Sequence, residues 1–92
     1  MEIDRITLIE PGGDVRLSLS GVTVRSVTPS NESLVFEAPR DSFDGTPIDG
    51  RASDGAGYGI IATTTDGVTY NGYVEVVANG DDTRFYWCGI DF

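Results

Sequence analysis

Apolar and polar residues alternate along most of the chain, and valine, isoleucine and threonine are frequent where they do. Alternation with a period of two is typical of β-strands with one buried face, whereas a helix needs apolar residues three or four apart. The pattern predicts a first strand at Ile3–Ile9 and another at 34–38. In the second of these, Leu34, Phe36 and Ala38 share one face. No segment predicts a long helix.

The phase of the alternation changes once in the first half of the chain. Apolar residues occupy odd positions in Val15–Leu19 and even positions in Val22–Val24. Ser20-Gly21 lies between them and shifts the phase by one residue. Two structures fit this shift: a tight two-residue turn between two strands, or a bulge that bends one long strand.

Three further strands are predicted near the end of the chain, at 58–65, 68–78 and 83–92. Asp66-Gly67 joins the first two and is typical of a type I′ hairpin turn, in which both central residues need positive φ. Asn79–Asp82 forms the next turn, so the three strands predict an antiparallel meander. Strict alternation places five residues on one face of the middle strand: Val68, Tyr70, Gly72, Val74 and Val76.

The whole chain of 92 residues is predicted to be one domain, because two cores would leave too few residues for each. Six or seven short strands without a long helix predict an all-β fold, a small antiparallel β-barrel or sandwich. Residues 39–57 form the least regular stretch and are expected to be an irregular loop. Loops longer than about 12 to 15 residues are usually functional or mobile.

The net charge of the chain limits the classes of partner that it can bind. Six arginines, no lysine and fifteen acidic residues give a net charge of −9. This composition resembles that of proteins from salt-accumulating halophilic archaea and their viruses. It argues against direct binding to nucleic acid or to an anionic membrane. The carboxylates are spread along the chain, and Glu2 and Asp4 are the only acidic pair at same-face strand spacing.

Residues for catalysis are scarce. The chain has no histidine and no lysine, which removes the common general base and the usual partners of nucleophiles. Cys88 lies in an aromatic strand and is expected to be a buried, inert thiol. Gly55–Gly59 leads into a strand rather than a helix, so it is not a phosphate loop. The aspartates of the irregular loop match no calcium motif. We therefore expect no enzyme activity, cofactor or metal.

A single cysteine excludes an internal disulfide, which makes the cytoplasm the default location. No apolar run approaches the roughly 18 residues that a membrane span needs, and the N-terminal residues do not resemble a signal peptide.

The last strand is apolar on both faces. Phe85 and Trp87 share one face, and Tyr86, Cys88, Ile90 and Phe92 share the other. Such a strand is either buried on both sides, here with residues 39–57 as a cover, or packed on the core with one face and on a partner with the other. The second alternative predicts six partner-binding residues: Tyr73, Phe85, Tyr86, Trp87, Ile90 and Phe92.

These observations favour a non-enzymatic protein-binding or assembly module that contacts another protein chain, either a second copy or a different protein. A virion component of a halophile would fit this description. The first alternative is an acidic inhibitor that occupies the nucleic-acid-binding surface of another protein. The second is a small-ligand binding domain.

Overall fold

The computed structural model describes residues 2–10, 16–19, 21–39 and 58–92, and these form seven β-strands and one short 3₁₀ turn. The elements are β1 (Ile3–Ile9), β2 (Arg16–Ser18), β3 (Thr23–Thr28), η1 (Pro29–Asn31), β4 (Ser33–Pro39), β5 (Gly59–Thr64), β6 (Thr69–Asn79) and β7 (Thr83–Ile90). The predicted all-β class without a long helix is confirmed, as are the bounds of the first strand.

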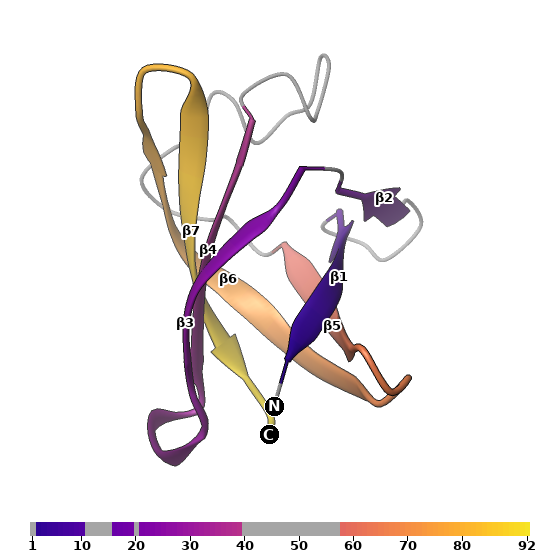
Figure 1. Cartoon of the computed structure of the whole chain (residues 1–92). Coiled ribbons are helices and arrows are strands. Elements are labelled where there is room, and N and C mark those ends of the chain that lie inside the picture. Colours follow the sequence, from indigo (N-terminus) through magenta and orange to yellow (C-terminus); the bar gives the residue numbers. More distant parts are fainter. Residues whose placement is uncertain (1, 11–15, 20, 40–57) are drawn as a thin grey trace.

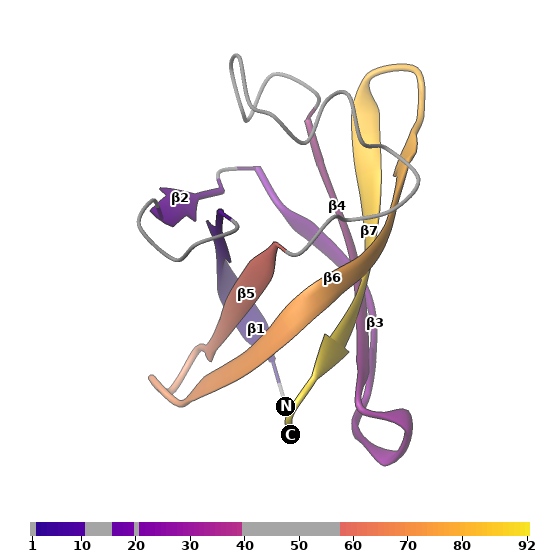
Figure 2. The ribbon, with the colours of Figure 1, turned by 180° about the vertical axis from the view of Figure 1, so that it is seen from behind.

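All seven strands belong to one antiparallel sheet in the order β2-β1-β5-β6-β7-β4-β3. The sheet is strongly curled and forms a barrel-like shell, seen from opposite sides in Figures 1 and 2. The adjacency of β5, β6 and β7 confirms the predicted C-terminal meander. Residues 40–57, in which nearly all of the expected irregular loop falls, lie outside the described residues.

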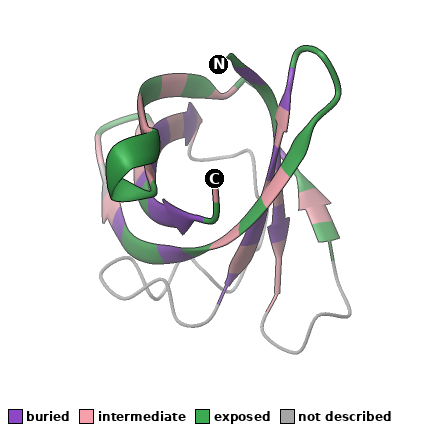
Figure 3. Ribbon diagram, turned by 90° about the horizontal axis from the view of Figure 1, so that it is seen from below, coloured by how far each residue is buried: buried purple, intermediate pink, exposed green. Residues whose placement is uncertain are grey.

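The inner face of the curled sheet carries the core. Figure 3 shows the sheet from below as a ring, with buried segments alternating with more exposed ones along the strands. Leu34, Phe36 and Ala38 are fully buried there, as their alternation predicts. The rings of Phe36 and Tyr86, direct partners on the neighbouring strands β4 and β7, stack on the inner face with their centroids 4.7 Å apart. Arg84 is also buried, because the alternation of β7 places it on the same face as Tyr86.

The structure excludes one of the two alternatives for the phase change at Ser20-Gly21, the tight hairpin turn. β2 pairs with β1 and β3 pairs with β4, so the two segments do not pair with each other as a hairpin would require. Gly21 has φ of 69°, which glycine adopts without strain. β2 and β3 are the two edge strands of the sheet, and Ser20 between them lies outside the described residues.

A bulge in β6 corrects one prediction. The pairing of β6 with β7 shifts between Val74 and Val76, which leaves Glu75 as the extra residue. A bulge of one residue reverses the face of everything that follows it. Val76 therefore lies on the outer face and is 42% exposed, while Val77 is buried in the core. The predicted placement of Val76 beside Val74 is wrong for this reason.

The turn between β5 and β6 differs from the predicted type I′ turn. Gly67 has φ of 91°, but Asp66 has no positive φ. The N–H of Gly67 donates to the carbonyl of Thr64, and the N–H of Thr64 donates to the carbonyl of Val68 at 2.8 Å. These contacts form a three-residue loop, a type I turn followed by a glycine bulge. The hairpin position is correct and the turn type is not.

Among the described residues, no helix is long and apolar enough to cross a membrane.

Candidate protein-binding face

The two faces of β7 have different environments. Tyr86, Cys88 and Ile90 point into the curled sheet and are buried, whereas Trp87 points outward and is 39% exposed. Phe85 lies on the outer face and is half-buried. Of the six residues predicted to bind a partner, Tyr86 and Ile90 therefore belong to the core and are not accessible in this structure.

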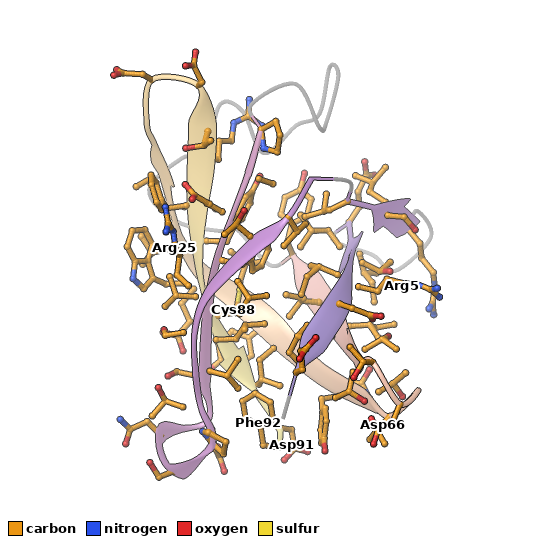
Figure 4. All side chains as sticks on the ribbon, in the orientation of Figure 1. Arg5, Arg25, Asp66, Cys88, Asp91 and Phe92 are labelled. Atoms are coloured by element: carbon orange, nitrogen blue, oxygen red, sulfur yellow. The ribbon has the colours of Figure 1, made fainter. Side chains whose placement is uncertain are left out.

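Phe92 lies after the end of β7, near the open end of the barrel. It is half-buried, and its ring packs against that of Tyr70 with the centroids 5.2 Å apart. Figure 4 places it beside Asp91, well away from Arg25 on the outer side of the sheet. Phe92 is thus a lid on the core rather than part of the outer surface.

Strand register brings the outward apolar residues together. Val35 of β4 pairs with Trp87 of β7, and Trp87 in turn pairs with Val76 of β6. Phe85 lies in the next outward row, with its ring centroid 6.3 Å from that of Trp87. Together with the neighbouring Tyr73, these residues form what we call the outer apolar patch: Val35, Tyr73, Val76, Phe85 and Trp87.

Exposure distinguishes this patch from an ordinary outer sheet face. The large hydrophobic side chains with high exposure among the described residues are Val68 at 45%, Tyr73 at 57%, Val76 at 42% and Trp87 at 39%. Three of them lie in the patch, and Val68 lies apart in the β5–β6 hairpin loop. Contiguous exposed apolar residues mark interaction sites more often than scattered ones do.

Gly89 explains how Tyr73 is held on this face. Tyr73 and Gly89 are direct partners across β6 and β7. A Cβ atom at Gly89 would lie 2.9 Å from Cζ of Tyr73 and 2.9 Å from Oε1 of Glu75. The phenol ring and the carboxylate therefore lie over the glycine, in space that any other residue would fill. This packing leaves the remaining surface of the ring exposed.

An ion pair borders the patch on the side of β3. Arg25, the extra residue of a bulge in β3, pairs with Glu37, which also accepts a hydrogen bond from the hydroxyl of Thr83 at 3.3 Å. Glu37 lies beside Phe85 in the strand register. Figure 4 shows Arg25 on the outside of the sheet. The charge of Glu37 is thus neutralised inside this face.

A shallow hollow of about 240 Å³ adjoins the patch at Tyr73. Three carboxylates, those of Glu32, Glu75 and Asp91, contribute to its wall. The remaining lining residues are Asn31, Asn71, Gly72, Tyr73, Gly89 and Ile90. The hollow holds no histidine or thiol, so its chemistry is that of an acidic surface.

Cys88 does not provide a nucleophile. Its side chain is buried in the core. Burial raises the pKa of the Cys88 thiol far above its usual range, and the negative charge of Glu75 raises it further. The thiol stays protonated at neutral pH and packs as a small apolar group. In the described part of the chain, no group of three or more metal-binding side chains comes together.

No protein family, curated protein or solved structure matches this chain. The outer apolar patch and its surroundings are therefore the features that point to a function. Alternation in the sequence identified Phe85 and Trp87 as one face. It missed Val76, because nothing in the residue pattern reveals the bulge at Glu75. It also missed Val35, whose role depends on the pairing of β4 with β7.

Proposed function

We propose that this protein is a non-enzymatic protein-binding module that contacts its partner through the outer apolar patch. The observation that carries the proposal is the outward row of Val35, Trp87 and Val76, flanked by Phe85 and Tyr73. Tryptophan and tyrosine are enriched at the energetic centres of protein interfaces. Removing apolar surface from water is favourable by about 25 cal/mol per Å², so covering the part of this patch that is still exposed favours binding.

The alternative functions find less support in the geometry. An inhibitor that imitates nucleic acid needs rows of carboxylates, yet the rows across β4, β7 and β6 are apolar at their centre. A small-ligand site is usually an enclosed, mostly apolar cavity. The hollow beside Tyr73 is acidic and open, which fits a small ligand poorly. The protonated thiol of Cys88 and the lack of histidine and lysine support a role without catalysis.

The charge composition supports a salt-rich environment for this module. Fifteen acidic residues without a single lysine are typical of proteins that work in concentrated salt. We place the protein in the cytoplasm of a salt-accumulating host, or in a virus of such a host, where the single cysteine needs no oxidising compartment.

Two matched substitutions test the proposal. Val76→Thr removes an exposed apolar group from the patch, and Val68→Thr removes one of similar exposure outside it. Affinity capture from a host extract should recover less of the partner with Val76→Thr than with Val68→Thr. Equal capture by both variants would refute the assignment of the patch. Circular dichroism of each variant confirms that the fold is intact.

A further inference from the structure

We infer that the partner presents lysine or arginine side chains on both sides of an apolar centre, roughly 20 Å apart. This inference rests on the proposed function and describes the chemistry of the surface that would cover the outer apolar patch. It comes from the position of the exposed carboxylates relative to the patch.

One end of the patch is acidic around Tyr73. Glu75 is exposed, and its carboxylate lies over Gly89 beside the phenol ring. Glu32 and Asp91 are exposed on the wall of the adjoining hollow. A partner that covers Tyr73 brings its own groups within reach of these carboxylates. Like charges placed there would repel, and cations would be attracted.

The other end of the patch is the turn between β6 and β7. Asp81 and Asp82 are both exposed in this turn, beyond Phe85 along the same hairpin. Between the two ends, the charge nearest the apolar centre is that of Glu37, which Arg25 already neutralises. Along the described part of this face, the pattern is therefore acidic, apolar, acidic.

Strand geometry gives the distance between the ends. Gly89 and Asp82 are seven residues apart, which corresponds to about 23 Å at 3.3 Å per residue of an extended strand. A helix of about 15 residues, at 1.5 Å per residue, spans the same length. The matching partner surface is thus an apolar segment of about this length with a cationic group at each end.

A second copy of the chain fits this surface poorly. Two copies that meet through their patches place acidic ends against acidic ends, whether the hairpins run parallel or antiparallel. Each copy also carries a net charge of −9. Ion pairs that become buried when the partner binds are screened by salt much less than exposed ones. The match between the acidic ends of the patch and the partner's cations therefore also discriminates between partners in concentrated salt.

Three synthetic helical peptides test the inference. Each has 16 residues, and the first two have a centre of leucine and alanine. The first carries two arginines at each end, the second has glutamine in place of every arginine, and the third carries all four arginines within one central turn. Binding is read from the emission of Trp87, the only tryptophan in the chain, which lies in the patch.

We expect the first peptide to bind at least about tenfold more tightly than the other two at 0.1 M KCl. Combining Glu75→Gln with Asp81→Asn and Asp82→Asn should lower its affinity about fivefold or more. Glu2→Gln with Asp4→Asn neutralises exposed carboxylates of the β1 region and serves as the control that leaves the affinity unchanged.

Three results would overturn the inference: similar affinity for all three peptides, no binding of the first, or an equal loss in the control variant. Sedimentation that shows dimers abolished by Trp87→Ser would also overturn it, since the occupant would then be a second copy. Similar peptide affinities that still depend on Trp87 would leave the proposed function standing. That function fails instead when Val76→Thr and Val68→Thr capture the same protein equally.

Discussion

Replacing Gly72 by alanine tests the closest backbone approach in the sheet. Gly72 pairs with Ile60 of β5 on one side and with Ile90 of β7 on the other. A Cβ atom at this position would lie 2.0 Å from the carbonyl oxygen of Gly89 and 2.9 Å from Cα of Ile90. Both obstacles are backbone, so no side-chain rotation relieves them. The strands β6 and β7 must separate where they hold Tyr73 over Gly89.

The cost follows from these distances. Overpacking a core costs about 1–3 kcal/mol, and occasionally more, when side chains and backbone can adjust. Here the carbonyl oxygen must move by more than 1 Å, and each ladder hydrogen bond lost costs about another 1 kcal/mol. We expect Gly72→Ala to lower the free energy of unfolding by about 3 kcal/mol or more, against a total of roughly 5–10 kcal/mol.

Gly59→Ala is the matched control for this substitution. Gly59 lies in β5 directly opposite Tyr73, yet a Cβ atom there would meet Ile9 at an ordinary distance of 3.5 Å. We expect no loss of stability, and a gain of up to about 1 kcal/mol from the stiffer unfolded chain. Urea unfolding of both variants measures the difference. Equal stability of the two variants would refute the close pairing of β6 with β7.

Three further results follow from burial and charge. Thermal unfolding should shift to higher temperature between dilute buffer and molar KCl, because salt shortens the Debye length from about 10 Å to 3 Å and screens the repulsion within a chain of net charge −9. A flat or falling melting temperature would contradict the halophilic interpretation. Between pH 8.5 and 9.5 the protein should lose about 1 kcal/mol more stability than its Cys88→Ala variant, because the unfolded thiol ionises with a pKa of about 8.5 while burial raises the pKa of the folded thiol above this window. Equal pH slopes in urea unfolding would show that Cys88 is not buried. Phe36→Ala should cost about 3–5 kcal/mol, and Trp87→Ser less than about 2 kcal/mol, because Phe36 is in the core and Trp87 is partly exposed; a similar loss of melting temperature in both would contradict an outward Trp87.

The strands could be predicted from the residue pattern because a half-buried strand leaves a period of two in the sequence. Ile3–Ile9 and the face of Leu34, Phe36 and Ala38 were predicted correctly for this reason. The order of the strands in the sheet was harder to predict from the sequence. β2 pairs with β1 and β3 pairs with β4, their neighbours along the chain, but the placement of β2 and β3 at opposite edges depends on the long-range pairing of β1 with β5 and of β4 with β7.

The alternation of apolar and polar residues did not predict the position of the bulge or the type of the turn. Glu75 is an unremarkable residue in a run of valines, yet its insertion turns Val76 outward and completes the patch. Asp66-Gly67 predicted a hairpin correctly, but the same two residues also suit the three-residue loop that the structure has. In the candidate site, alternation identified Phe85 and Trp87 as one face. It could not tell which face of the strand is inside, because both are apolar.

Site-specific photocrosslinking in the native host tests directly whether the outer apolar patch binds a partner. A photoreactive phenylalanine analogue replaces Val76 in one variant and Val68 in another, two positions of similar exposure on different parts of the surface. If the outer apolar patch binds the partner, position 76 forms a crosslink to one defined protein and position 68 does not. The same crosslinked product from both positions, or a product from position 68 alone, would contradict it.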